Sequence, residues 1–195
     1  MDKIYFATGN EGKYLSLKKY FATHGVDIDV ERASVEMTEP QAETATEVAL
    51  SKARQAFAAL NQPVVVDDSS FHISALGGFP GPYIKYMLST IGIVGILDFL
   101  ARHDDRSAYF LSTLVYIDQT GQEHVFEDEP YKGTISKNIV EVDRKESWSD
   151  LYKVFIPDGT HKALVELTDE ERRSLNTQGD SYDAFTQWIK SELSH

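Results

Sequence analysis

Cysteine is absent from the 195 residues of this chain, so no disulfide bond can form. A chain without cysteine is typical of the reducing cytoplasm, which is where we expect this protein to act. Long apolar runs are absent as well. The best candidate, residues 91–100, is interrupted by glycine and falls short of the roughly 18 residues that a membrane span needs. The first ten residues read as a short strand that breaks at glycine, and we expect no export signal.

Basic residues are scarce. Lys and Arg number 19 against 31 Asp and Glu, which gives a net charge of −12. This balance argues against duplex nucleic acid as a partner, because no surplus of cations is present to replace its counterions. A small anionic ligand would need a local cluster of lysines and a divalent metal. At this length we expect either one sizeable domain over residues 1–195 or two small lobes that share a core.

The spacing of apolar residues predicts an α/β fold. Ile4–Ala7 forms a short strand, and a helix with apolar residues on one face follows over residues 14–21. A second helix over Glu43–Leu60 leads into Val64–Val66, a β-branched run typical of a strand buried on both faces. This order predicts a mixed β-sheet flanked by helices.

The second half of the chain continues this pattern. Residues 75–82 hold three glycines and two prolines, which predicts a shaped loop, and a helix should begin near Pro82 or Tyr83. The other predicted elements are a helix over Val94–Ala101, a β-hairpin over Ala108–Glu127, a strand over Gly133–Val142, and a helix over Asp180–Leu193 with Tyr182, Phe185, Ile189 and Leu193 facing inward.

The segment Thr8–Lys13 is a candidate anion site. It lies between the first strand and the first helix, where backbone N–H groups and the helix dipole attract anions. Lys13 adds a positive charge, while Gly9 and Gly12 allow a ligand to approach the backbone closely. The spacing matches neither the P-loop nor the dinucleotide-binding fingerprint. Both a phosphate site and an ordinary capped turn are consistent with it.

Two adjacent carboxylates, Asp67 and Asp68, follow the valine run, so we expect them at a strand end, where ligands collect in open α/β sheets. Neighbouring strand residues point to opposite faces, so one of the two suffices for a given site. Carboxylate oxygens suit Mg²⁺, and Glu43 is a candidate for a second carboxylate. A turn cap is the alternative interpretation. Lys52 and Lys85 are candidate cations, although an exposed lysine is usually only solvated.

Read together, these segments resemble the inosine triphosphate pyrophosphatase family. The run ALGGFPGPYIKY at residues 75–86 is similar to the family's A-L-G-G-x-P-G-P-Y-I-K-W/Y signature at almost every position. Earlier matches are TGNEGK at 8–13 to T/S-x-N-x-x-K, EPQAE at 39–43 to E-x-Q-x-E, KA at 52–53, and VDDS at 66–69 to the central acidic segment. The resemblance covers at least residues 1–140.

The resemblance implies a two-lobed α/β homodimer with a long mixed sheet and a cleft between the lobes. It also implies Mg²⁺-dependent hydrolysis of ITP, dITP or XTP to the monophosphate and pyrophosphate. Carried over by position, the residues that bind the triphosphate are Thr8, Gly9, Asn10 and Lys13, those that reach Mg²⁺ are Glu43 and Asp68, and those that compensate phosphate charge are Lys52 and Lys85. The candidate for orienting the attacking water is either Asp67 or Asp68.

The last third of the chain departs from the family pattern. The family's G-[FW]-[GW]-x-D-P-x-F-x-P-x-G stretch corresponds to residues 147–159, of which only the tail aligns. Trp148 or Tyr152 is a candidate for stacking on a base, and a core or interface aromatic is the alternative.

The family's later S-H-R motif, which reads the purine six-position oxygen, has neither its His nor its Arg here. Arg172 or Arg173 is a candidate for the place of the family's lysine near the phosphates. Thr177, Gln178 and Ser181 are candidates for reading a different base edge, and relaxed recognition is the alternative. An insertion of about three residues would make Gly179 and Asp180 the start of the last helix.

Three functional hypotheses follow. The first is a pyrophosphatase acting on a purine nucleoside triphosphate, with base preference left open. The second is a catalytically weak nucleotide-binding or regulatory relative, and the third is a house-cleaning hydrolase of modified pyrimidine nucleotides. Retention of Lys13, Glu43, Asp68 and Lys85 favours the first, because a pure binder has little need for a metal set.

Overall fold

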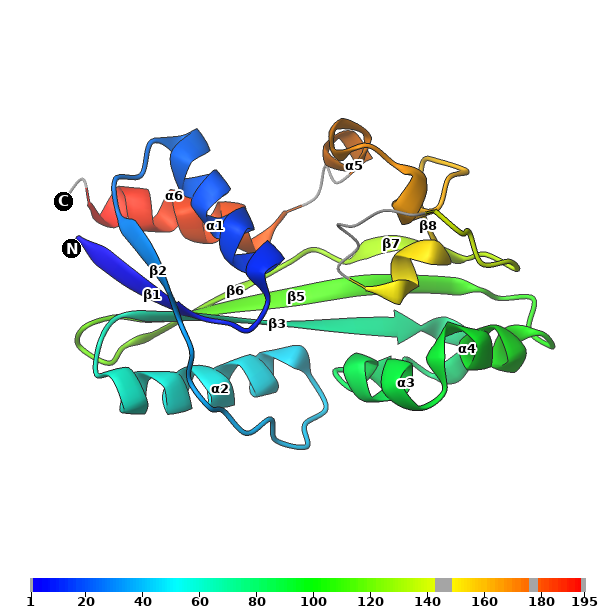
Figure 1. The fold of residues 1–195 in the computed structure, drawn as a ribbon, viewed down its shortest axis with the longest axis horizontal. Helices are drawn as coiled ribbons and strands as arrows, with labels where there is room; N and C mark the ends of the chain where they lie inside the picture. The colour runs from blue at the N-terminus through cyan, green and yellow to red at the C-terminus, as the bar shows by residue number, and fades with distance from the viewer. Residues whose placement is uncertain (1, 143–148, 176–178, 194–195) are drawn as a thin grey trace. The chain divides into compact units, whose positions relative to one another are not determined.

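The chain folds into helices and strands that alternate along the sequence, as a computed structural model describing residues 2–142, 149–175 and 179–193 shows (Figure 1). In chain order the elements are β1 (Lys3–Ala7), α1 (Glu11–His24), β2 (Asp29–Ala33), α2 (Ala45–Leu60), β3 (Val64–Ile73), β4 (Pro80–Gly81), α3 (Ile84–Thr90), α4 (Gly92–Leu100), β5 (Ser107–Ile117), β6 (Glu123–Glu127), β7 (Tyr131–Ile135), β8 (Phe155–Pro157), α5 (Asp169–Leu175) and α6 (Ser181–Glu192). Short 3₁₀ helices are η1 (Ser74–Leu76), η2 (Asp150–Lys153) and η3 (Leu164–Glu166).

The strands form one mixed sheet in the order β2-β1-β3-β5-β7-β8, with β4 beside β3 and β6 beside β5. β1 is parallel to β2 and β3, whereas β5 is antiparallel to β6 and β7. The predicted mixed sheet flanked by helices is therefore confirmed.

Two compact units make up the chain. The first comprises Met1–Ser69, Ser112–Glu129 and Gly179–His195, and the second Ser70–Leu111 and Pro130–Gln178. The long strands β3 and β5 run from one unit into the other. The single nucleotide-hydrolysing domain and the cleft between lobes stay predictions.

The first unit buries both faces of its strands because these carry continuous apolar runs, in which successive side chains point to opposite faces. Val65 packs with residues of α1 and α6 on one face, including Leu17 and Phe185. Val64 and Val66 pack with the alanines of α2 on the other face. In Figure 1, α1 and α6 accordingly lie on one side of these strands and α2 on the opposite side. The strand predicted at Val64–Val66 is confirmed.

Side-chain caps set where the helices of the first unit begin. The side chain of Asn10 accepts a hydrogen bond from the backbone N–H of Lys13 at the start of α1. Thr44 and Glu47 form a capping box at the start of α2, so this helix begins just after the predicted Glu43. Asp180 caps α6, which confirms the predicted helix start.

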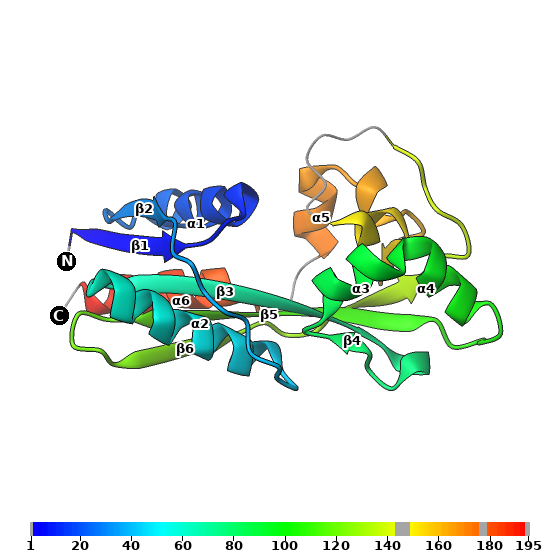
Figure 2. The same ribbon diagram turned by 60° about the horizontal axis from the view of Figure 1, so that its bottom comes forward.

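The second unit has its own apolar core. Phe71 and Ile73 of β3 pack with residues of α3 and α4, with Phe155 of β8, and with Leu164 of η3. The two-residue strand β4 pairs antiparallel with the end of β3, and Figure 2 shows it beside that strand.

Several predicted boundaries are wrong. The strand expected over Gly133–Val142 ends at Ile135, and the chain leaves the sheet there. Leu193 is 44% exposed rather than buried, because α6 ends before it. Strand β2 was not predicted. The expectation that Asp67 and Asp68 lie at a strand end is also wrong, because β3 continues to Ile73.

Candidate active site

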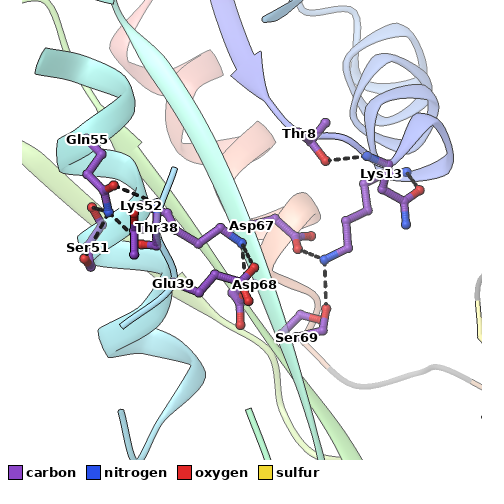
Figure 3. A network of polar contacts seen from close by, with 12 residues as sticks. Thr8, Lys13, Thr38, Glu39, Ser51, Lys52, Gln55, Asp67, Asp68 and Ser69 are labelled. Carbon is purple, nitrogen blue, oxygen red and sulfur yellow. Dashed lines mark hydrogen bonds and ion pairs between the residues drawn. The ribbon is translucent and has the colours of Figure 1, made fainter. Parts of the chain in front are cut away.

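The two carboxylates in the middle of β3 face opposite sides of the sheet. They continue the alternation of the valines before them, so Asp67 shares the face of Val65 and Asp68 the face of Val66. Both side chains are buried, with 2% of Asp67 and 12% of Asp68 exposed. Figure 3 shows Asp67 directed toward Lys13 and Asp68 toward Lys52. Each carboxylate thus meets one of the predicted lysines.

On the α1 face, Lys13 is held by two groups of β3. Its ammonium donates to Asp67 Oδ1 and to Ser69 Oγ, the latter at 3.1 Å. Ser69 Oγ also lies 2.9 Å from Ser112 Oγ of β5. The Asp67 Oδ2 atom accepts a hydrogen bond from the hydroxyl of Tyr182 at 2.5 Å. Each oxygen of Asp67 therefore has a protein partner.

The turn before α1 brings the other predicted phosphate ligands next to Lys13. Thr8 Oγ1 accepts from the backbone N–H of Asn10 at 3.0 Å, which shapes the turn. A Cβ built at Gly9 would meet no atom within 4 Å among the described residues, so the backbone there is open to a ligand. Thr8, Gly9, Asn10 and Lys13 thus form one short arc at a helix N-terminus.

On the α2 face, two carboxylates share the ammonium of Lys52. It donates to Asp68 Oδ1 at 2.8 Å and to Glu39 Oε1 at 3.2 Å. Burial raises the pKa of Asp68, and the attraction of Lys52 opposes this without cancelling it. Burial alone would lower the pKa of Lys52, but Asp68 and Glu39 reverse the effect and raise it. Lys52 is therefore a cation at neutral pH.

The oxygen donors on this face fit Mg²⁺. The ion is usually bound by one or two carboxylates together with waters and substrate phosphates, and the carboxylates of Asp68 and Glu39 lie close together, both bonded to the Lys52 ammonium. Three acidic or histidine side chains suitable for an all-protein metal cage occur nowhere in the described ranges. The two-carboxylate arrangement therefore suits a metal that shares its shell with phosphate.

Glu43, the other predicted metal ligand, lies exposed just before α2. Its backbone N–H donates to Glu47 Oε2 at 3.0 Å, as part of the helix cap. Its role as a metal ligand stays a prediction.

Three further predicted substrate-binding residues, Lys85, Tyr152 and Arg172, belong to the second unit. Lys85 lies exposed in the first turn of α3, in the second unit. In the same unit the guanidinium of Arg172 lies 5.4 Å from the ring centre of Tyr152. Two nitrogens of Arg172 donate to the carbonyl of Leu164, at 2.8 and 3.1 Å. The structure thus brings Tyr152 and Arg172 together, whereas Trp148, Thr177, Gln178 and the side chain of Arg173 lie outside the part of the chain that it describes.

Ser181 begins α6 and is fully buried. Its backbone N–H donates to Asp128 Oδ1 at 2.7 Å, which attaches the start of α6 to the end of the β5–β6 hairpin. Ser181 as a base-reading residue stays a prediction.

Comparison with known proteins decides the family. The sequence matches the Ham1 family profile over residues 4–188. The chain belongs to the Ham1 family. A dITP/XTP pyrophosphatase of Methanopyrus kandleri is 37% identical over 191 residues, which cover 98% of each chain. An inosine triphosphate pyrophosphatase 2 of Trypanosoma cruzi is 31% identical over 175 residues, 89% of this chain and 85% of that one. The resemblance found in the sequence is confirmed.

Solved structures of Ham1 proteins share the fold. A HAM1 protein from Coxiella burnetii has a TM-score of 0.83 at 21% identity, covering 98% of this chain and all of that one. The Ham1 protein of Staphylococcus aureus has a TM-score of 0.79 at 22% identity over the same shares. At these identities the likeness concerns the fold alone.

Three residues that lie at the predicted site were not identified from the sequence. Glu39 and Ser69 lie within matched motifs but were not assigned a role, and their contacts with Lys52 and Lys13 place them at the site. Tyr182 was expected only as a core residue of the last helix. No sequence signal marks Tyr182, because its partner Asp67 is 115 positions away.

Proposed function

We propose that this protein hydrolyses a purine nucleoside triphosphate with a non-standard base, such as dITP, XTP or ITP, to the monophosphate and pyrophosphate. One observation carries the proposal: two buried carboxylates at adjacent positions of β3, each paired with a lysine from an opposite face of the sheet. Such a set provides cations for phosphates and carboxylates for a metal and a water. The names of the family's curated relatives supply the substrate class.

The arc Thr8–Lys13 is our candidate for the triphosphate site. An ammonium group has three N–H donors, and two of those of Lys13 are directed at Asp67 and Ser69. Among the described residues the Lys13 ammonium has no third partner, so its third N–H can serve a phosphate oxygen, and the Lys13 side chain keeps 18% of its surface exposed. The α1 N-terminus adds the positive end of its helix dipole.

The charges of the site call for a divalent cation. Lys13 and Lys52 face three carboxylates, those of Glu39, Asp67 and Asp68. A polyanionic triphosphate would meet net repulsion there, so binding needs added positive charge. We assign Mg²⁺ to Asp68 with Glu39, and Glu43 stays a further candidate. When bound, the ion supplies positive charge that neutralises the phosphates.

Asp68 is our choice for orienting the attacking water. Both oxygens of Asp67 are occupied by protein donors, and its side chain is almost fully enclosed. Asp68 has one oxygen bonded to Lys52 and is the more exposed of the two. Lys85 stays a candidate for compensating phosphate charge, Arg172 for the place of the family's lysine near the phosphates, and Tyr152 for stacking on the base.

A triphosphate panel tests the proposal. Pyrophosphate release is measured with Mg²⁺ on dITP, XTP, ITP, ATP, GTP and the pyrimidine triphosphates. We expect the first three to be the best substrates and chelation of Mg²⁺ by EDTA to stop turnover. Failure to hydrolyse any of them would remove the proposal, and a preference for pyrimidine triphosphates would replace its substrate class.

The variant Asp68→Asn tests the role of Asp68 in the reaction, because it keeps the side-chain shape and removes the charge. We expect kcat to fall at least about 100-fold, as for loss of a general base or metal ligand. The control is Asp104→Asn, which removes an exposed acid of the second unit and leaves kcat unchanged. Wild-type kcat in Asp68→Asn would exclude Asp68 from the site.

We also propose that the protein is a cytoplasmic homodimer. In the ranges that the structure describes, no helix is long and apolar enough to cross a membrane. Helices α3 and α4 expose large apolar side chains, including Tyr86 at 71%, Val94 at 59% and Phe99 at 55%. Such a group of exposed apolar side chains suits burial against a second copy. Light scattering on the purified protein measures the mass, and a monomer of 22.0 kDa contradicts the dimer.

A further inference from the structure

The buried carboxylate of Asp67 links α6 to α1. Its Oδ1 atom accepts from the ammonium of Lys13, and its Oδ2 atom from the hydroxyl of Tyr182 at 2.5 Å. Only 2% of the Asp67 side chain is exposed. A carboxylate enclosed in this way does not contact a substrate. Its effect on one passes through Lys13, whose orientation it determines.

Tyr182 is rigidly held. It lies in the first turn of α6 and is 8% exposed. Its backbone N–H donates to Asp180 Oδ1 at 2.8 Å, and its ring lies 5.8 Å from that of Tyr20 and 6.5 Å from that of Phe6, measured between centres. Its hydroxyl therefore reaches Asp67 with little freedom to turn away.

The hydroxyl of Tyr182 stays protonated, and can therefore donate, at neutral pH. Burial raises its pKa most, and the charge of Asp67 and the hydrogen bond to it raise it further. A neutral donor suits this place, because it fixes the carboxylate without competing as a cation for the phosphates. A second cation in its place would pair with Asp67 and weaken its hold on Lys13.

We propose that Tyr182 is a positioning residue of the active site: its hydroxyl fixes the Asp67 carboxylate, which fixes the Lys13 ammonium for the triphosphate. This inference rests on the proposed function, because that function assigns Lys13 to the substrate. It also gives α6 a role at the phosphate end of the site, whereas the sequence assigned the start of this segment to the base.

Tyr182→Phe tests the inference, because it keeps the ring and removes only the hydroxyl. We expect KM for the best triphosphate to rise about 10-fold, and kcat to change less than about 3-fold, since Asp68 and Lys52 lie on the other face of β3. A merely structural role would lower the amount of folded enzyme and reduce apparent kcat without raising KM.

Tyr20→Phe is the matched control. It removes a hydroxyl from the same group of aromatic rings, but that hydroxyl donates to Asp180 rather than to Asp67. Thermal unfolding of both variants shows that each is folded at the assay temperature. We expect wild-type KM in Tyr20→Phe, and an equal rise in both variants would overturn the inference, because a looser α6 would then be the cause.

A double-variant cycle provides a second measurement. If Tyr182 acts through Lys13, then adding Tyr182→Phe to Lys13→Ala should raise KM no further, and additive effects contradict the proposal. Should Tyr182→Phe fail to fold, Asp67→Asn tests the next link and should also raise KM more than it lowers kcat. An unchanged KM in Asp67→Asn overturns the inference.

The proposed function and the positioning role of Tyr182 are tested by different outcomes. If the wild type hydrolyses no triphosphate, the proposed function and this inference both fall. If the wild type is active and Tyr182→Phe keeps its KM, only the positioning role of Tyr182 falls.

Discussion

The buried carboxyl group of Asp128 should make the stability of this protein depend on pH in a specific way. Its Oδ1 atom accepts from the backbone N–H of Ser181, which attaches α6 to the β5–β6 hairpin and so helps to place Tyr182. Burial raises the pKa of Asp128 most, the hydrogen bonds from Ser181 oppose this, and the charges of Asp180 and Asp67 add to the increase. Together they raise the pKa from 3.8 to about 6.

The raised pKa of Asp128 determines whether the protein gains or loses stability as the pH changes. Because the folded-state pKa lies above the unfolded one, the folded protein holds a proton between pH 4 and 6 that the unfolded chain has lost. Ionised Asp128 therefore destabilises the fold above pH 6, and this penalty decreases as the pH falls below 6 and is absent only below the unfolded-state pKa of 3.8. A shift of about two pKa units corresponds to at most about 3 kcal/mol. Since the side chain is only partly buried, we expect about 1–2 kcal/mol.

Asp128→Asn measures this penalty. Asparagine is neutral at every pH and keeps an oxygen that can accept from Ser181. We expect the variant to exceed the wild type in free energy of unfolding by about 1–2 kcal/mol at pH 8, and by clearly less at pH 4.5, as measured by urea unfolding. Asp104→Asn controls for the loss of one negative charge from a protein of net charge −12. A variant that is less stable at pH 8, or that differs equally at both pH values, would refute the reasoning.

Three further predictions concern packing, capping and the buried ion pair. Gly133→Ala should lower the free energy of unfolding by about 2–3 kcal/mol in denaturant, because its Cβ would lie 2.3 Å from the carbonyl oxygen of Ile156 in β8. Thr44→Ala removes the cap of α2 and should cost about 1 kcal/mol by the same measurement. Lys52→Met leaves Asp68 buried without its cation and should cost about 3 kcal/mol at pH 8. The cost of Lys52→Met should be smaller at pH 5, because burial raises the pKa of Asp68 and a proton can then replace the missing charge.

The sequence by itself determined the elements whose signal is local. The valine run before Asp67 predicted a strand buried on both faces, and the same alternation predicted that the two aspartates would face opposite sides. Asp180 marked the start of α6 because a helix cap needs only residues close in sequence. The run at residues 75–86, read together with the motifs around Lys13, Lys52 and Asp68, identified the family, and the profile match over residues 4–188 confirms it. Each of these inferences depends on neighbours within one element.

The tertiary structure decided which of these residues meet. The same local pattern failed to show that β3 continues past Asp68, because the residues that extend it are stabilised by partners in the second unit. It did not show that Glu39 shares Lys52 with Asp68, or that the hydroxyl of Tyr182 bonds to Asp67 across 115 positions. Such contacts depend on which helices cover which face of the sheet. The periodicity of apolar residues indicates that a helix has a buried face. Only the packing of α1 and α6 on the same face of the sheet brings Lys13 and Tyr182 to one carboxylate.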